Sequence, residues 1–464
     1  MFADNSLDAE RRALEIGRSF LRGNADGAVV DVGHACPSTF PALPEAGVGE
    51  LEALETYWSS HGGQHSRSSG PRYFGFVTGG VTPAALTADI LVPYLDQNVA
   101  TERHSIAAYI EELALAQVLD LLALPRDELS GVLVTGTSAA NLACLAGARQ
   151  WCGQQAGYDI AEDGIAGAPR ITVFAGTPHT SIHKAMSTLG LGRRNLCEVP
   201  SLPGREAVDT AALAEALASR PGTQKIVVAS AGTVNTGDFD ALPEVADLCE
   251  RHGAWLHVDG AFGAFARSLP EYAHLAAGME RADSLSVDGH KWLNLPYDCG
   301  LAFSRHMDRQ EMSFSADAPY VPKDGTLPAF MNRAVEQSRR YRALPLYLSL
   351  QAYGRAGFRR IFEDNCRFAR RLSDWIDASQ DFERLAETRL NIVCFRGSYE
   401  DETVDARNRD LLQRINGSGR LFMTPTTYKG RFCFRLAASN WQTGDGDLNI
   451  VTDTLTQAFG SQTA

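Results

Sequence analysis

Short apolar runs alternate with stretches of helical character from residue 131 onward, and this alternation constrains the fold more than any other feature of the chain. Strands that alternate with helices are typical of a mainly parallel β-sheet covered by helices on both faces. The expected strands are 132–135, 171–174, 226–230, 255–259, 284–288 and 300–303, and the expected helices are 138–152, 180–189, 207–219 and 241–252. The sequence therefore predicts an α/β fold, whose ligand site should lie beyond the carboxyl ends of the strands.

The chain is too long, at 464 residues, for one simple core, so we expect two domains and an N-terminal arm. Residues 6–22 predict an amphipathic helix and 106–124 a further helix, whereas 24–50 should be irregular and 59–70 a loop. Beyond residue 344 we expect helices at 344–356, 358–379 and 446–458 and strands at 390–396 and 431–437. The predicted organisation is an arm over 1–85, a large α/β domain over 86–343 and a small α+β domain over 344–464.

Charge and cysteine content exclude several classes of function. Lys and Arg number 43 against 56 Asp and Glu, and a net charge of −13 disfavours nucleic acid or an anionic membrane surface as a partner. No run of about 18 uncharged apolar residues predicts a membrane span. The nine cysteines include no C-x-x-C pair, so we expect no metal. Residues 1–12 are polar and acidic, unlike a signal peptide, and a cytoplasmic protein is expected.

Two of the expected strand ends carry small and polar residues. Gly136, Thr137 and Ser138 follow the first strand and open a helix, where free amides and hydroxyls suit a phosphate group. Taken alone, the same residues describe an ordinary capped helix. His179 follows the strand 171–174, and by itself it reads equally well as an exposed residue at a helix start.

Two further strand ends carry charged residues. Asp259 ends an apolar strand and is followed by small residues, so burying it requires a cation or a donor, although a helix cap or a structural ion pair would also serve. Lys291 follows the strand 284–288, where desolvation would make its amine nucleophilic; the alternative is a side chain that reaches solvent.

The four features together match the needs of pyridoxal phosphate. This cofactor requires a phosphate cup, a group facing its ring, a carboxylate for the pyridine nitrogen and a lysine for the Schiff base. A lysine-dependent aldolase would not need the ring-facing pair, and the G-x-x-x-x-G-K-[ST] motif of P-loop enzymes is absent. A non-catalytic binding protein would not need the lysine, the acid and the histidine together.

With these features the chain resembles the group II pyridoxal-phosphate-dependent amino-acid decarboxylases, the family of aromatic-L-amino-acid and glutamate decarboxylases. The resemblance covers roughly residues 70–441. Its motifs are residues 71–76 (PRYFGF), 96–98 (DQN), 136–138 (GTS), His179, 232–237 (GTVNTG), 257–262 (HVDGAF), 290–292 (HKW) and 338–340 (SRR).

The resemblance implies a role for each matching residue. Lys291 would bind the cofactor covalently, Asp259 would keep the pyridine nitrogen protonated and His179 would stack on the ring; these three are the predicted catalytic residues. The other predicted cofactor contacts are Gly136, Thr137, Ser138, Thr233, Asn235, Ala261 and His290. The implied reaction is the conversion of an L-amino acid to its amine and CO₂.

The substrate is less clearly defined by sequence. Tyr73, Phe74 and Phe76 match an aromatic pocket segment of the relatives and favour an aromatic substrate, although the same residues also suit a hydrophobic core; Asn98 is a further pocket candidate. An acidic substrate is the alternative. Its second carboxylate would suit Arg103, Arg333 or Arg435, although each of these arginines could instead face solvent.

The family also implies a quaternary structure and one departure. Relatives are homodimers of pyridoxal-phosphate fold type I, and the helix 6–22 would embrace the partner while residues 96–104 reach the partner's site. Many relatives carry a proton-donating Tyr before the Ser-Arg-Arg element, and here Phe330 or Met331 takes its position. Without that donor, oxygen-dependent aldehyde formation is the alternative reaction.

Overall fold

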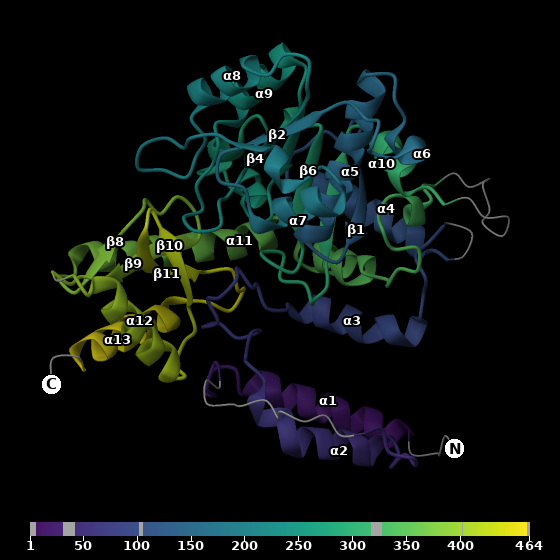
Figure 1. Cartoon of the computed structure of the whole chain (residues 1–464). Helices are drawn as coiled ribbons and strands as arrows, with labels where there is room; N and C mark the ends of the chain where they lie inside the picture. The colour runs from purple at the N-terminus through teal and green to yellow at the C-terminus, as the bar shows by residue number, and fades with distance from the viewer. Residues whose placement is uncertain (1–5, 31–41, 102–104, 317–326, 401, 462–464) are drawn as a thin grey trace.

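The computed structural model describes residues 6–30, 42–101, 105–316, 327–400 and 402–461. Figure 1 shows a large α/β region, a smaller sheet with its own helices, and a helical pair at the N-terminal side. None of the helices in these ranges is long and apolar enough to cross a membrane.

A seven-stranded sheet organises the large region, in the order β1-β7-β6-β5-β4-β2-β3. Its strands are β1 (Ser130–Val134), β2 (Ile171–Ala175), β3 (Leu196–Glu198), β4 (Gln224–Ser230), β5 (Trp255–Asp259), β6 (Ser284–Asp288) and β7 (Gly300–Ser304). All of them run in parallel except β7, which is antiparallel to both β1 and β6. The fold is thus the predicted α/β fold with a mainly parallel sheet, while the reversed β7 and the short β3 are additions to the prediction.

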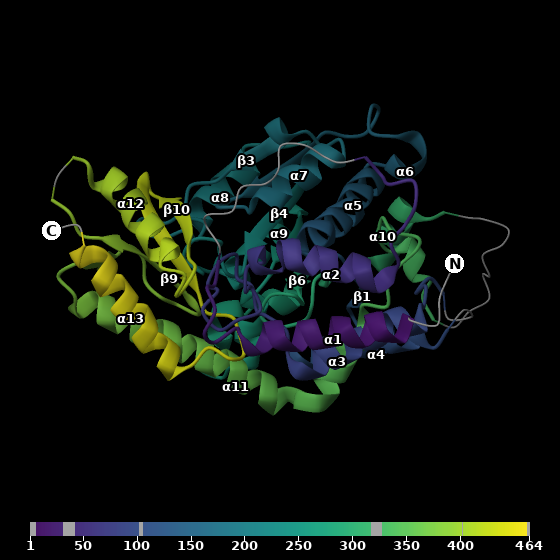
Figure 2. The same cartoon turned by 90° about the horizontal axis from the view of Figure 1, so that it is seen from below.

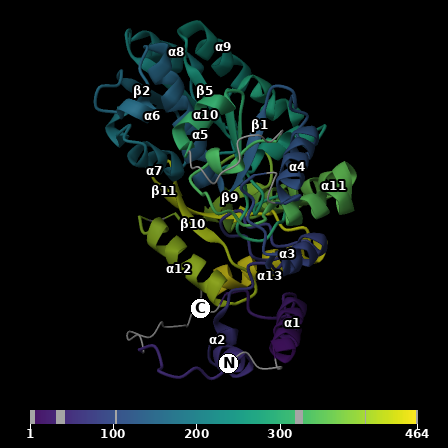
Figure 3. The same cartoon turned by 90° about the vertical axis from the view of Figure 1, so that its right-hand side faces the viewer.

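Helices cover both faces of this sheet because successive strand residues point to opposite sides. Ile226 and Val228 of β4 belong to the apolar cluster formed with α5 and α7, whereas Val227 belongs to the cluster that includes α8 and α9. The helices of this region are α4 (Ala107–Leu121), α5 (Thr137–Gln155), α6 (Ile160–Asp163), α7 (Thr180–Thr188), α8 (Thr210–Ala218), α9 (Leu242–His252) and α10 (Met307–Phe314). Figure 3 shows them around the sheet.

The second sheet is antiparallel and has four strands in the order β10-β11-β9-β8. They are β8 (Phe382–Arg384), β9 (Ile392–Gly397), β10 (Thr424–Tyr428) and β11 (Arg431–Ala437), packed with α12 (Val404–Gly417) and α13 (Asp445–Gly460). Helix α11 (Ala343–Ala378) leads into this region and has one non-helical residue, Gly354 (φ 56°, ψ −173°). Two helices were expected, at 344–356 and 358–379. The structure places the break between them at Gly354, two residues before the expected end of the first helix.

The N-terminal residues form α1 (Ser6–Arg22) and α2 (Glu50–His61), which pack against each other, and α3 (Pro83–Leu95), which packs against α11. Figures 1 and 2 show α1 and α2 side by side. Most of helix α2 lies at 51–58, where no element was expected, and its last turn extends into the loop expected at 59–70. Helix α3 was not expected because its apolar residues lie all around the helix. Short 3₁₀ turns complete the described chain: Gly62–Gln64, Arg193–Asn195, Gly263–Ser268, Ala273–Ala276, Met279–Arg281 and Phe330–Asn332.

Candidate active site

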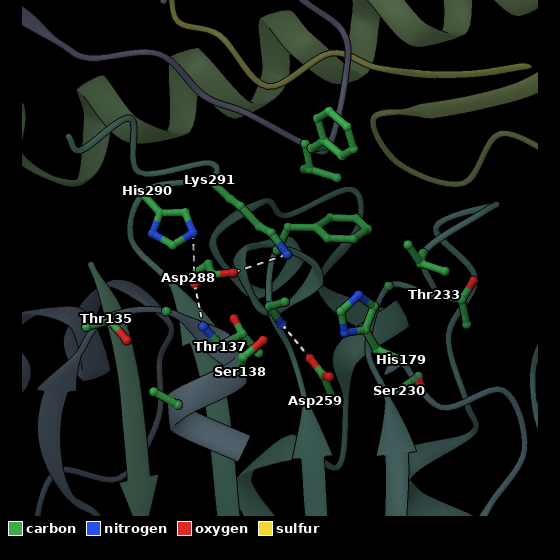
Figure 4. Close-up of a pocket in the computed structure, with 18 of the residues that line it drawn as sticks. Thr135, Thr137, Ser138, His179, Ser230, Thr233, Asp259, Asp288, His290 and Lys291 are labelled. Atoms are coloured by element: carbon green, nitrogen blue, oxygen red, sulfur yellow. Dashed lines mark hydrogen bonds and ion pairs between the residues drawn. The ribbon is translucent and has the colours of Figure 1, made fainter. Parts of the chain in front are cut away.

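A cavity of about 500 Å³ opens at the carboxyl ends of the parallel strands, the edge at which the sequence predicted the ligand site. Figure 4 shows its side chains rising from β4, β5 and β6 and from the turns after β1 and β2. We call the strand-end residues Thr137, His179, Asp259, Asp288 and Lys291 the floor of the cavity. The rim is formed by Phe76, Tyr297 and Arg435, which come from other segments.

Lys291 lies in the turn that follows β6 and is paired with a carboxylate. Its Nζ is 3.1 Å from Oδ2 of Asp288, the buried last residue of that strand. The backbone N–H of Thr137 donates to Oδ1 of Asp288 at 2.7 Å, and Nε2 of His290 lies 3.4 Å from the same oxygen. Burial raises the pKa of Asp288, but the charges of Lys291 and His290 outweigh it, so the net shift of the pKa is downward. Asp288 therefore holds Lys291 within the cavity as an ionised partner.

Asp288 ends the expected strand 284–288, and the sequence motifs gave it no role. Its position supplied a signal that the sequence analysis did not use. A carboxylate that ends a buried strand three residues before a predicted reactive lysine requires a cation, and that lysine is the nearest one.

Asp259 ends β5 and faces the middle of the cavity (Figure 4). Its Oδ1 accepts the backbone N–H of Ala261 at 3.2 Å, and its Oδ2 accepts Nδ2 of Asn141 at 3.0 Å. Ala261 also lines the cavity. The carboxylate is thus held in one orientation by two donors, which suits the recognition of a protonated ring nitrogen.

His179 ends the turn after β2 and caps helix α7. Its Nδ1 lies 2.7 Å from Oγ of Ser181 and 3.3 Å from the backbone nitrogen of the same residue. Burial lowers the pKa of His179, and the positive charges of Lys291 and Arg435 act in the same direction, partly offset by Asp259 and Asp288. A neutral imidazole therefore lines the cavity at neutral pH.

The start of α5 forms the end of the cavity that suits a phosphate. Thr137 and Ser138 line it, and Oγ1 of Thr137 is a buried hydroxyl without a partner among the described residues. A Cβ atom on Gly136 would lie 2.9 Å from Cε1 of His290, so only glycine allows this close approach. Burial lowers the pKa of the His290 imidazole, which Asp288 partly opposes. The unpartnered hydroxyl, the first amides of a long helix, the acid and the lysine together fit pyridoxal phosphate.

Thr233 and Asn235 are held by a buried acid that sequence reasoning missed. Oγ1 of Thr233 donates to Oε2 of Glu206 at 2.5 Å, and Nδ2 of Asn235 donates to Oε1 of Glu206 at 2.8 Å. Thr233 lines the cavity, whereas Asn235 does not and accepts a hydrogen bond from Thr426. The signal for Glu206 is absent from the local pattern, because this acid precedes the residues it binds by nearly thirty positions.

The predicted aromatic segment divides between cavity and core. Phe76 lies at the rim with 60 % of its surface exposed. Phe74 is 1 % exposed and stacks on Phe368 in the apolar cluster beside the second sheet, and Tyr73 stacks on Phe422 at 4.9 Å. The structure therefore brings Phe76 to the cavity and leaves Phe74 and Tyr73 outside its lining.

Asn98 and Phe330 also lie outside the cavity lining of their own chain. Oδ1 of Asn98 accepts the backbone N–H of Arg339 at 2.8 Å. The Phe330 ring is fully buried between the guanidinium groups of Arg333 and Arg339, each 5.5 Å from its centroid. Within the chain, Asn98 thus binds a backbone amide, and Phe330 packs in the core.

The three arginines considered for a second carboxylate differ in their surroundings. Arg333 is buried and committed, because its Nε donates to Glu311 at 2.8 Å and its side chain also binds the Gly131 carbonyl. Arg435 lines the cavity and donates to the Val234 carbonyl at 2.6 Å, while its buried Nε lacks a partner among the described residues. Arg103 lies outside the described residues.

Comparison with known proteins identifies the family. Residues 62–398 match the model of the pyridoxal-dependent decarboxylase conserved domain, which is more than half of the chain. The chain belongs to this family. It is a pyridoxal-phosphate-dependent decarboxylase, as the sequence predicted.

Individual relatives agree with this membership. Tryptophan decarboxylase 1 of Oryza sativa subsp. japonica is 28 % identical over 447 residues, which covers 89 % of this chain and 84 % of the relative. An aromatic-L-amino-acid decarboxylase of Bacillus atrophaeus is 28 % identical and covers 87 % of this chain and 84 % of its own. The crystal structure of the Oryza sativa TDC with PLP and tryptamine superposes with a TM-score of 0.90, at 24 % identity, over 99 % of this chain and 98 % of that one. This likeness confirms the fold of this decarboxylase.

Proposed function

We propose that this decarboxylase acts on an aromatic L-amino acid and releases the corresponding amine and CO₂. The observation that carries the proposal is the rim, where the rings of Phe76 and Tyr297 are 60 % and 61 % exposed beside the floor. Exposed aromatic rings at the mouth of a cavity favour an apolar, aromatic ligand. The relatives named above, which act on aromatic amino acids by name, support the same substrate class.

Bound pyridoxal phosphate would supply an aldehyde that takes the amino group of the substrate and a protonated ring that accepts the electron pair left on Cα when CO₂ departs. Lys291 would hold the cofactor through Nζ, and Asp259 would hold the proton on the ring nitrogen. Thr137, Ser138 and His290 would bind the phosphate, with Gly136 leaving space for it.

The remaining floor and rim residues orient the reacting groups. His179 would cover one face of the ring and Ala261 the other. Asp288 would form an ion pair with Lys291 whenever that amine is not bonded to the cofactor, and this pair keeps the amine inside the cavity. Thr233, fixed by Glu206, closes the side of the cavity. The Nε of Arg435, which has no partner among the described residues, offers one site for a carboxylate, and an acidic side chain of a substrate would compete for this site.

A substrate panel tests this proposal. Purified enzyme is incubated with aromatic, acidic and aliphatic L-amino acids, and CO₂, amine, ammonia, peroxide and aldehyde are measured together. The expected result is that aromatic substrates have the highest kcat/KM and yield amine with CO₂. Faster turnover of glutamate or aspartate than of every aromatic substrate would contradict it, and loss of that activity in Arg435→Met would assign the acidic substrate to Arg435.

We also propose a homodimer in a reducing, cytoplasmic compartment. Leu7, Leu21, Leu91, Tyr94 and Leu95 on α1 and α3 are exposed apolar side chains, and a second copy would cover them. The eight described cysteines are free thiols, which suits a reducing compartment.

Truncation tests the dimer. We expect deletion of residues 1–22 to weaken both self-association and turnover, because the partner would lose the apolar face of α1. Sedimentation velocity and kcat are measured on the same samples. An undiminished kcat in a sedimenting monomer would contradict the proposed assembly.

A further inference from the structure

A chain of buried polar side chains runs beneath the floor of the cavity, and none of them was among the predicted site residues. Trp255, Ser284, His257 and Asn141 are fully buried or nearly so, and Asn141 also reaches Ser181. The two ends of this chain meet groups of fixed hydrogen-bonding character. An indole N–H only donates, and a carboxylate only accepts. The direction of every bond between the two ends can therefore be deduced.

The acceptor end is Asp259. One side-chain atom of Asn141 lies 3.0 Å from Oδ2 of Asp259. Because a carboxylate oxygen only accepts, this atom must be the amide nitrogen Nδ2 and not the amide oxygen. The amide oxygen of Asn141 then faces Nε2 of His257 at 2.9 Å and must accept a proton from it. His257 consequently carries its proton on Nε2.

The donor end is Trp255. Its Nε1–H donates to Oγ of Ser284 at 2.9 Å, and Oγ of Ser284 lies 2.9 Å from Nδ1 of His257. Burial lowers the pKa of His257 to about 4, so the ring is neutral at pH 7 and Nδ1 accepts the Ser284 hydroxyl proton. Both ends therefore give the same direction for the chain, with each donor and acceptor used once.

A branch from Asn141 reaches His179. The second N–H of the Asn141 amide points to Oγ of Ser181 at 2.9 Å, so this oxygen acts as an acceptor and its own proton is free to be donated. Nδ1 of His179, 2.7 Å away, receives that proton and is also approached by the backbone N–H of Ser181. A nitrogen that accepts from two donors carries no proton in the neutral ring.

We infer that Asn141 and Ser181 are positioning residues that hold His179 in the tautomer with its proton on Nε2. The imidazole therefore presents an N–H donor, rather than a lone pair, to the cavity. One amide group of Asn141 sets both the orientation of Asp259 and the tautomer of His179, and the two groups face the same cavity. The charged groups that face His179 are Asp259, Asp288, Lys291 and Arg435. The inference rests on the contacts among these residues, so it holds whichever amino acid is the substrate.

Nitrogen-15 NMR of the full-length holoenzyme tests the tautomer directly. The eleven histidines are labelled at both ring nitrogens, spectra are recorded by magic-angle spinning at pH 8, and the His179 signals are assigned by subtracting the spectrum of His179→Gln. We expect a protonated Nε2 and an unprotonated Nδ1 in the wild type. A protonated Nδ1 in the neutral wild-type ring would overturn the inference, whatever the substrate panel shows.

Asn141→Asp reverses the branch. The oxygen that replaces the amide nitrogen draws the Ser181 hydroxyl proton toward itself, so Ser181 becomes an acceptor for His179 and the signal of the unprotonated Nδ1 should be lost. Retention of that signal in correctly folded Asn141→Asp would contradict the inference.

Substitutions at Ser181 provide a second readout if Asn141→Asp does not fold. Ser181→Ala should move the Nδ1 resonance and lower kcat about tenfold with a smaller change in KM, because one hydrogen bond to the ring is lost. Ser181→Thr keeps a hydroxyl and should restore both. Ser187→Ala removes an exposed hydroxyl from the same helix and is the matched control, with an unchanged spectrum and kcat. Equal spectra for Ser181→Ala and the wild type would refute the assigned role.

Discussion

The floor and the rim of the cavity are built in different ways. The floor residues lie at the ends of strands of one sheet or directly after them. Their side chains are held by groups at neighbouring strand ends and helix starts, as Asp288 is by the N–H of Thr137 at the start of α5. The rim residues come from the segment before α3, from the β6–β7 connection and from β11 of the second sheet. The floor is therefore determined by sheet topology, whereas the rim depends on how separate segments pack over the sheet. We expect the chemistry of the family to reside in the floor and substrate choice in the rim.

Loss of Lys291 should have the largest effect. Lys291→Ala removes the only lysine that lines the cavity among the described residues, so borohydride should no longer trap a covalent cofactor adduct and turnover should fall to background. Mass spectrometry of the reduced protein locates the adduct, with Lys184→Ala, an exposed lysine on α7, as the control. An adduct on a different lysine would show that the floor is wrongly assigned.

Asp259→Asn should have the next largest effect. Asparagine keeps a polar contact but cannot stabilise a protonated ring nitrogen, so kcat should fall by about 10²-fold or more while the cofactor still binds. Cofactor absorbance and single-turnover rates separate binding from chemistry. Near-normal kcat in this variant would show that Asp259 has no electrostatic role in the reaction.

His257 reaches Asp259 through Asn141, and its effect should appear in the pH dependence of the free energy of unfolding. The folded-state pKa is about 4, whereas the unfolded-state pKa is the ordinary 6.5, so the unfolded chain binds more protons between these values. Stability should therefore fall by about 3 kcal/mol as the pH falls from 6.5 to 4, and should change little from this group below pH 4.

Denaturant unfolding at several pH values measures this dependence. His257→Gln retains a donor and an acceptor but does not titrate, and its unfolding free energy should change less over the same pH range. Identical pH dependence in wild type and variant would mean that His257 is not the buried titrating group.

Phe76 should have the smallest effect and should act on the substrate. Phe76→Ala is expected to raise KM for an aromatic substrate by about tenfold, because part of an apolar contact is lost, with a smaller change in kcat. Phe74→Ala is the contrast: it should lower stability by about 3 kcal/mol and leave KM unchanged, since its ring is buried in the apolar cluster beside the second sheet. If Phe74→Ala raised KM and Phe76→Ala did not, the division of this segment between core and rim would be reversed.

The same contrast explains how much the sequence could reveal. The strands β2 and β4 and the residues after them were predicted because a buried parallel strand is a short, mostly apolar run, and its carboxyl end is readable from sequence alone. The direction of β7 was not predicted, because an apolar run has the same pattern in either direction. Helix α3 lacks a polar face, so its periodicity gave no signal.

Long-range contacts account for the remaining differences at the site. Glu206 and Asn141 act on residues that are distant in sequence, so no local spacing pointed to them. Tyr297 reaches the rim from a loop, where its ring centroid lies 4.3 Å from that of His290. Phe74 and Phe76 are close in sequence, but only the packing around the second sheet decides which of them is buried.

The reversed strand β7 has a consequence for the lysine that precedes it. Because β7 runs back from the cavity, the segment between Gly289 and Cys299 leaves and re-enters the sheet at the same edge, and the N–H groups of Gly289 and His290 both donate to the Cys299 carbonyl. The lysine thus sits on a closed loop of about ten residues, whose ordering entropy is lost when the chain folds and not when a ligand arrives. A longer loop would be less ordered before the ligand arrives, so part of this entropy would be lost on binding and cofactor retention should weaken.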